Sequence, residues 1–282
     1  MTASPSSAAQ AAREHLAVRL RDIRRDAGLT GEELARRCGW SPSKRSRIEN
    51  ARTPPSDADV RDWCTACGAA DQAADLVAAN RQADQMYVHW KKLHRHGMRR
   101  AQDEVLPLYA HTRRFRIYCS NVVPGILQTQ AYATALLSTI ARFQGTPDDA
   151  PEAAASRIER SDVLHQGDHC FAFLLEEAVL RYRIGPAETM ASQLGYLLAV
   201  MALPNVSLGI IPTDAERQMW PLEAFYLFDD RQVSSELLTA AVNVTAPSEV
   251  AAYAKAFGEM SKGAVYGPRA RALISGAINT LG

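Results

Sequence analysis

The sequence predicts two folded parts: an all-α amino-terminal domain of five helices, residues 13–80, and an α+β domain, residues 105–282. In the first part, apolar residues recur at helical spacing, with capping residues and glycines between the runs. In the second part, helical and strand patterns alternate, and the one readable hairpin predicts a small, mainly antiparallel sheet. We expect residues 1–12 to be disordered and residues 81–104 to form a helical basic linker.

Capping signals divide the first domain. Thr30, followed three residues later by Glu33, is a capping box, in which hydroxyl and carboxylate satisfy backbone N–H groups at a helix start. Ser41 precedes Pro42, a residue that suits the first turn of a helix. We expect helices over residues 13–27, 30–38 and 41–50, one that begins at Ser56, and one over residues 71–88.

Elements of the second domain follow from the period of the apolar residues and from the turn residues between them. The Asp229-Asp230-Arg231 segment separates two short strands and predicts a hairpin. We expect helices over residues 126–143, 150–165, 189–203, 248–262 and 268–279. We expect strands over residues 170–175, 206–211, 225–228 and 233–238.

Charge is distributed unevenly along the chain. Residues 1–100 carry 18 Lys and Arg against 12 Asp and Glu, whereas the remainder carries 14 against 19. A basic module on an acidic remainder suits a phosphate-binding domain, although two solvated surfaces would also explain it. The five cysteines suggest no disulfide framework, and we find neither a signal peptide nor a membrane-spanning apolar stretch. We therefore expect a cytoplasmic protein in a reducing compartment.

The chemistry of the first domain concentrates in its second and third helices. Gly39 lies in the tight turn between them, and the third helix carries Lys44, Arg45 and Arg47. A short helix with small and basic side chains at its amino end, where Ser41 stands, can enter the major groove of DNA. Its amino-terminal N–H groups also favour a nearby phosphate. A helical hairpin alone is weak evidence, so the interpretation depends on the whole string of residues.

That string resembles the helix-turn-helix domain of the phage-repressor or xenobiotic-response-element family over residues 13–80. The matching residues are Gly28-Leu29-Thr30, Glu33-Leu34-Ala35, Gly39, Ser41 and Ser46-Arg47-Ile48-Glu49-Asn50. The resemblance implies contacts to bases from Ser43, Lys44 and Arg47, and contacts to phosphates from Thr30, Asn50 and Arg52. It also implies a pair, Arg24 and Glu49, that bridges the first and third helices and holds Arg24 near the DNA backbone.

Three residues depart from the family pattern. Gly31 stands where glutamine is usual, which removes one phosphate contact. Arg45 stands where an apolar residue usually packs; it would turn outward or add a DNA contact, because an unpaired buried charge is costly. Ala51 replaces the usual glycine after Glu-Asn, so the end of the third helix is expected to differ.

The second domain resembles the carboxy-terminal domain of Scr1-type, WhiJ-like regulators of actinobacteria over residues 105–275. The matching strings include Val123-Pro124-Gly125-Ile126-Leu127-Gln128-Thr129-Gln130-Ala131-Tyr132-Ala133, Leu174-Leu175-Glu176-Glu177-Ala178-Val179-Leu180-Arg181 and Leu203-Pro204-Asn205-Val206. Residues 158–162 depart from it, because they lack an expected Arg-Gln pair. The resemblance implies an antitoxin-like regulator that acts with a small cognate partner protein, dimerises or receives a small ligand. Gln128, Thr129 and Tyr132 are candidate contacts, although the Pro124-Gly125 turn is first of all a helix start.

Other candidate sites are better explained by structure. Cys64 and Cys67 invite a zinc or redox interpretation, but both lie on the expected inner face of one helix. A metal site at His89, His94 and His96 finds equally little support. Glu176 and Glu177 are adjacent on an expected strand, so they face opposite sides and form no acid–base pair. We expect no catalytic site, no metal and no cofactor.

The sequence therefore predicts a sequence-specific transcriptional regulator that binds a double-stranded DNA operator as a homodimer. The alternative is an antitoxin-like interaction module whose main role is to bind a small cognate protein. An enzyme in the second domain is a third hypothesis, which a cofactor bound to the purified protein would revive.

Overall fold

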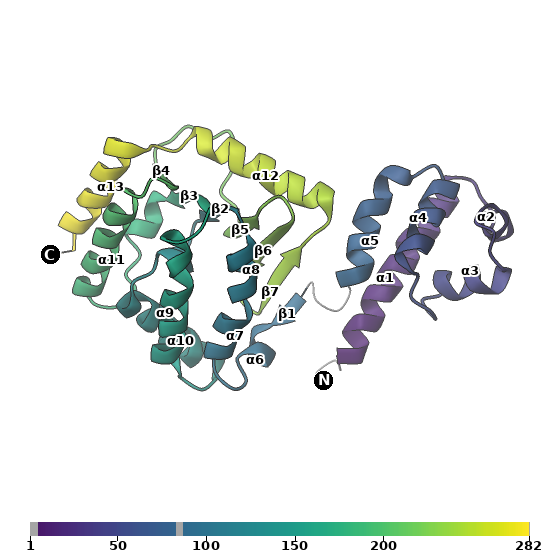
Figure 1. Ribbon diagram of the computed structural model, residues 1–282, viewed down its shortest axis with the longest axis horizontal. Helices are drawn as coiled ribbons and strands as arrows, with labels where there is room; N and C mark the ends of the chain where they lie inside the picture. The colour runs from purple at the N-terminus through teal and green to yellow at the C-terminus, as the bar shows by residue number, and fades with distance from the viewer. Residues whose placement is uncertain (1–4, 83–86, 282) are drawn as a thin grey trace. The chain divides into compact units, whose positions relative to one another are not determined.

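The computed structural model describes residues 5–82 and 87–281. The chain divides into two compact units (Figure 1). The first contains the chain up to Tyr87 together with residues 243–250, and the second contains residues 88–242 and 251–282. Each unit has its own core and is described by itself.

Up to Gln82 the first unit is helical, whereas residues 243–250 belong to elements that are given with the second unit. Its elements are α1 (Pro5–Asp26), α2 (Gly31–Arg37), α3 (Pro42–Glu49), α4 (Asp57–Ala66), the 3-10 helix η1 (Ala70–Gln72) and α5 (Ala73–Gln82). The prediction of five helices is therefore incomplete, because η1 precedes α5. The expected disordered segment overlaps α1 from Pro5 onward, whereas residues 1–4 lie outside the described residues. The predicted fifth helix ends early, at Gln82, since Tyr87–His89 forms strand β1.

A tryptophan anchors the core of the first unit. Trp63 of α4 is fully buried, and its Nε1 donates a hydrogen bond to the Leu20 carbonyl of α1 at 2.9 Å. Leu34 of α2 and Ile48 of α3 belong to the same apolar cluster. Burying the indole with its N–H satisfied avoids the cost of an unpaired polar group. The inward faces of four helices are thus held together, which fixes α2 and α3 relative to α1.

The second unit combines helices with a sheet. Its helical elements are α6 (Trp90–Leu93), α7 (Arg99–Glu104), α8 (Leu106–His111), η2 (Gly125–Leu127), α9 (Gln130–Gln144), α10 (Ala150–Arg160), η3 (Ser161–Leu164), η4 (Glu177–Leu180), α11 (Ala187–Val200), α12 (Pro247–Lys262) and α13 (Gly267–Asn279). Its strands are β2 (Arg114–Cys119), β3 (Cys170–Glu176), β4 (Val206–Ile211), β5 (Phe225–Phe228), β6 (Gln232–Glu236) and β7 (Ala240–Val244). Across the described ranges, no helix has both the length and the apolar character needed to cross a membrane.

The sheet is mixed, which corrects the prediction of a mainly antiparallel one. Its strand order is β1-β7-β6-β5-β2-β3-β4. Strand β3 pairs in parallel with both β2 and β4, whereas β5 pairs antiparallel with β2 and β6. The predicted hairpin of β5 and β6 is therefore present, but it joins a parallel half through β2. The prediction failed because it did not include β2.

Strand β2 has the alternating pattern of a half-buried strand, but two arginines within it make the pattern hard to recognise from the sequence. Phe115, Ile117 and Cys119 alternate with the more polar side of the strand and are buried. Arg114 and Arg116 interrupt the apolar run, and both form ion pairs with Asp230 at the turn after β5. A residue distant in the sequence thus allows charged side chains on a central strand.

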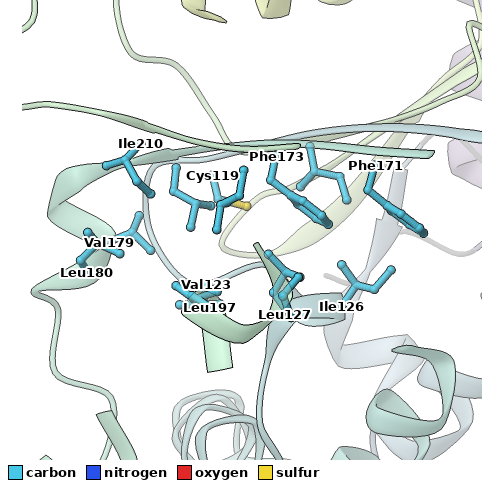
Figure 2. Packing of buried hydrophobic residues seen from close by; sticks show 14 of the residues in the cluster. Cys119, Val123, Ile126, Leu127, Phe171, Phe173, Val179, Leu180, Leu197 and Ile210 are labelled. Atoms are coloured by element: carbon cyan, nitrogen blue, oxygen red, sulfur yellow. The ribbon is translucent and has the colours of Figure 1, made fainter. Parts of the chain in front are cut away.

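Aromatic and aliphatic side chains cover both faces of the sheet. On one face, Phe171 and Phe173 of β3 lie opposite Ile126 and Leu127 of η2 (Figure 2). The two phenylalanine rings stack with centroids 5.9 Å apart. On the other face, Phe225 of β5 contacts Tyr253 and Phe257 of α12. A sheet buried on both faces explains the long apolar runs of β3 and β4.

Candidate nucleic-acid interface

Two side-chain caps and one glycine position the third helix. The Thr30 hydroxyl and N–H both donate to the Glu33 carboxylate at 2.7 Å, and these hydrogen bonds lower the pKa of Glu33. Gly39 lies in the turn at φ +67°, a left-handed conformation that glycine adopts without strain. Ser41 Oγ accepts the Lys44 backbone N–H at 3.2 Å and begins α3. The caps therefore fix where α2 and α3 begin, and the packing of Ile48 in the core determines which face of α3 is presented to solvent.

The exposed face of α3 carries polar and cationic side chains. Ser43 and Arg47 lie one turn apart, are both exposed, and are joined by a hydrogen bond of 3.3 Å from Arg47 Nη1 to Ser43 Oγ. Asn50 ends the helix and is exposed, as is Arg52 directly after it. Asn50 Nδ2 donates to the Ser46 carbonyl at 2.8 Å. This face can enter a major groove, and its Arg and Asn side chains can donate to bases or phosphates.

Lys44, predicted to face the bases, is directed toward α4. Its ammonium lies 2.6 Å from Asp59 Oδ1 and 4.4 Å from the ring centroid of Trp40. Burial opposes ionisation of Asp59, but hydrogen bonds from Lys44 and Ser56 outweigh it and lower the pKa of Asp59. Lys44 would have to leave this ion pair before it could contact a base.

A buried glutamate gathers arginines from α1 and α3. Glu49 is buried, and its Oε1 lies 2.7 Å from Arg24 Nη2, so the two residues bridge α3 and α1. Its Oε2 lies 2.6 Å from Arg45 Nη1, and the Glu49 carbonyl accepts a hydrogen bond from Arg21 Nη2 at 2.6 Å. Burial opposes ionisation of Glu49, but the hydrogen bonds from Arg24 and Arg45 lower its pKa. The carboxylate therefore remains charged and orients these arginines.

Two of the three departures from the family pattern compensate for one another. A Cβ atom at Gly31 would lie 2.5 Å from Arg45 Cζ, so the guanidinium occupies the space that a side chain at position 31 would need. The Arg45 side chain is 20% exposed and paired with Glu49. It neither turns fully outward nor lies buried without a partner, although its Nε has no hydrogen-bond partner within the described part of the chain. Glycine at 31 thus leaves the space that the Arg45 guanidinium fills.

The third departure preserves the usual helix ending. Ala51 has φ +54°, the left-handed conformation in which glycine normally ends a helix. The N–H of Ala51 donates to the Ile48 carbonyl at 3.0 Å, and the N–H of Arg52 donates to the Arg47 carbonyl at 2.8 Å. These two bonds form a Schellman motif with alanine in place of glycine. The expectation that the helix would end differently was therefore wrong, because the hydrogen bonds are those of the usual ending. Alanine adopts the left-handed conformation there with backbone strain that glycine would avoid.

The candidate partner or ligand residues of the second unit are largely buried. Gln128 Nε2 donates to the Val123 carbonyl at 2.7 Å, and Tyr132 OH accepts the Val123 N–H at 3.3 Å. Thr129 begins α9, and its backbone N–H donates to Gln193 Oε1 at 2.8 Å. Gln128 and Tyr132 therefore hold the segment before α9 in place, and neither lies on an exposed surface.

Glu176 and Glu177 have separate partners, but the prediction that both lie on one strand was wrong, because β3 ends at Glu176 and η4 begins at Glu177. Glu176 accepts hydrogen bonds from Tyr118 OH at 2.9 Å and from Arg217 Nη2 at 2.6 Å. Glu177 accepts the Thr213 N–H at 3.1 Å, which together with Arg181 lowers its pKa despite partial burial. Each carboxylate thus ties a strand end to a loop.

The cysteines and histidines that invited a metal interpretation are dispersed. Burial raises the pKa of the Cys64 thiol to about 11, so it is protonated at neutral pH. His94 is buried and stacks on Trp90, whereas His96 is exposed and accepts a hydrogen bond from Arg95. The side chain of His89 lies outside the described part of the structure. Within that part, no group of three or more His, Cys, Asp or Glu side chains could hold a metal ion.

Sequence reasoning missed Arg21. It lies one turn before Arg24 on α1 and, through the Glu49 carbonyl, contacts the carboxyl end of α3. The spacing of three residues between these arginines was the available signal, because it places both on one helix face.

Comparison with known proteins yields two family matches. Residues 15–77 match a helix-turn-helix domain, and residues 102–276 match a domain of unknown function, DUF5753. No curated protein matches the chain. The first match covers α2 and α3 with their flanking helices, and the second covers most of the second unit.

Proposed function

We propose that this chain, which belongs to the DUF5753 family and carries a helix-turn-helix domain, is a sequence-specific transcriptional regulator. The observation that carries the proposal is the exposed face of α3, where Ser43 and Arg47 stand free of any acidic partner in the described structure. Arginine that can form two hydrogen bonds to a guanine edge is the commonest specific contact in the major groove. We therefore assign base reading to Ser43 and Arg47.

Contacts to phosphates would surround this face. Asn50 and Arg52 follow α3 and are exposed, and Thr30 stands at the start of α2. Arg24 is held by Glu49, so its role is to orient the interface as much as to contact DNA. Arg45 is drawn into the same cluster, and we assign it a positioning role. Such contacts supply most of the affinity but little of the specificity.

Selection of bound sequences from random DNA, followed by fluorescence anisotropy with the full chain, tests the proposal. Arg47→Ala should weaken binding to the selected site by about 1–3 kcal/mol, which is roughly a fivefold to hundredfold rise in Kd, and leave binding to random DNA almost unchanged. Arg61→Ala, an exposed arginine on α4, is the matched control and should change neither. Equal losses on both DNAs would remove Arg47 from base reading, and failure to select any sequence would contradict the proposal.

The second unit is proposed to regulate the first by receiving a small partner protein or ligand, by dimerising, or both. Support for a protein contact comes from Leu237 and Leu238 between β6 and β7, which are 44% and 73% exposed. Apolar side chains at an exposed turn favour contact with another protein over solvent. Glu176 and Glu177 are engaged separately, so we propose no enzymatic role for them.

The alternative, an antitoxin-like interaction module, is tested on the full chain. A small protein that copurifies at fixed stoichiometry, is lost in Leu238→Asp and is retained in Arg47→Ala would support it. Light scattering then gives the oligomeric state with and without that protein. A chain that purifies alone as a monomer and still selects DNA would contradict both the partner and the homodimer.

A further inference from the structure

Two arginines of α10, one buried and one half-buried, have no acidic partner among the residues that the structure describes. Arg157 and Arg160 lie three residues apart and therefore on one face of the helix. Arg160 is only 7% exposed, and Arg157 is half-buried. Neither guanidinium forms an ion pair with any residue in the described ranges, 5–82 and 87–281. A pair of cations in this position requires an explanation.

Their hydrogen-bond partners are neutral. Arg157 Nη1 donates to Gln128 Oε1 at 2.7 Å. Gln102 Oε1, on α7, is shared by Arg157 Nε at 3.2 Å and Arg160 Nη1 at 3.1 Å. The Tyr109 ring centroid lies 4.7 Å from Arg160 Cζ. Arg160 Nε is buried and has no hydrogen-bond partner in the described structure. Amides and a ring orient the guanidiniums but do not neutralise them.

The site therefore keeps an excess of positive charge. Burial lowers the pKa of Arg157, and the neighbouring charge of Arg160 lowers it further. The carboxylate of Glu236 on β6 acts in the opposite direction, but it is exposed and forms no ion pair with either arginine. Folded proteins normally pair buried cations, because an uncompensated buried charge is strongly unfavourable. A bound anion would supply the missing compensation.

The backbone of the segment before α9 approaches the guanidiniums closely. A Cβ atom at Gly125 would lie 3.2 Å from Arg160 Nη2, closer than most side-chain contacts, and 3.5 Å from Arg157 Cδ, in ordinary contact. Gln128 is fixed through its Nε2 to Val123, so that its oxygen faces Arg157. The partial exposure of Arg157 leaves an approach from solvent. The Pro-Gly segment singled out from the sequence thus helps to form this cluster.

We propose that Arg157 and Arg160, oriented by Gln102 and Gln128, bind the carboxylate or phosphate group of a small molecule. The planar guanidinium presents two parallel N–H donors, which match two oxygens of either group. The burial of Arg160 favours a small ligand over a protein surface. The inference rests on the sensing role proposed for this unit and gives it a ligand class. Its test uses no DNA, so failure of this site and failure of DNA recognition are distinguishable.

Thermal unfolding of the full chain, followed by titration calorimetry, tests the site. The probes are inorganic phosphate and acetate, each compared with sodium chloride at equal ionic strength. One of them should raise Tm saturably, by about 5–10 °C at roughly a hundred times its Kd. The probe that acts distinguishes a phosphate-bearing ligand from a carboxylate. Equal effects of all three salts would overturn the proposal.

Substitutions separate a binding site from a structural cluster. Arg160→Met should weaken anion binding by about tenfold or more, while Tm without anion stays equal or rises because an unpaired buried charge is removed. Arg157→Lys, which keeps the charge but loses the planar fork, should also weaken binding. Arg142→Met, an exposed arginine on α9, is the control and should respond as the wild type does. An anion response that survives in both Arg157→Lys and Arg160→Met would overturn the proposal.

Discussion

Gly31→Ala perturbs the compensation between positions 31 and 45. Alanine stabilises the middle of a helix relative to glycine by about 0.5–1 kcal/mol, and the lower end applies at Gly31, the first residue of α2. Here the new Cβ would lie 2.5 Å from Arg45 Cζ, so the guanidinium must shift, and the effect on stability depends on how much of its hydrogen bond to Glu49 Oε2 it loses. Loss of a hydrogen bond between charged groups costs about 1.5–3 kcal/mol, and the lower end applies because Arg45 is partly exposed. We expect a net destabilisation of about 1 kcal/mol.

The effect of Gly31→Ala on the free energy of unfolding should have the opposite sign once Arg45 is removed. In Arg45→Ala the space beside residue 31 is open, so Gly31→Ala should stabilise by about 0.5 kcal/mol, the lower end for a helical position. Urea unfolding followed by tryptophan fluorescence measures both effects in a Trp90→Phe, Trp220→Phe background, where the signal comes from Trp40 and Trp63 in the first unit. A double-mutant cycle gives a coupling energy of about 1.5–2 kcal/mol. Identical effects of Gly31→Ala in both backgrounds would refute the compensation.

Three further predictions concern stability and reactivity. Because the pKa of Glu49 is lowered by folding, its stabilisation is present above the ordinary carboxyl pKa and is lost as the pH falls through the lowered value. Glu49→Gln should cost about 3 kcal/mol at pH 7 and flatten this acid limb in urea titrations, whereas an unchanged limb would exclude Glu49 as its source. Ala51→Gly should stabilise by about 0.5 kcal/mol, since relief of about 1–2 kcal/mol of left-handed strain exceeds about 0.8 kcal/mol of lost methyl burial; a lower urea midpoint would contradict this. Iodoacetamide at pH 8 should label exposed Cys170 well before Cys64, whose buried thiol has a pKa of about 11, and mass spectrometry that finds equal rates would contradict the burial.

Local sequence signals were sufficient where neighbouring residues decide the structure. The capping box of Thr30 and Glu33 and the strand Val206–Ile211 are confirmed with the predicted residues. Predicted boundaries were wrong where one continuous helical pattern covers two elements. The helix predicted to begin at Ala150 ends at Arg160, and the 3-10 helix η3 continues it. The prediction of the sheet was wrong because it missed β2. The charge of Arg116 on this strand is compensated by Asp230, 114 residues away in the sequence. Hydrophobic pattern alone cannot reveal such a partner.

By itself, the sequence determined the helix-turn-helix module, its caps and the cationic third helix, because these depend on residues within a few positions of each other. Only the tertiary structure decided where the long charged side chains end. It turned Lys44 toward Asp59, placed Arg45 over Gly31, and buried Arg160 beside amide oxygens. The position of a flexible cation depends on partners brought together from distant segments, and these partners exist only once the chain has folded.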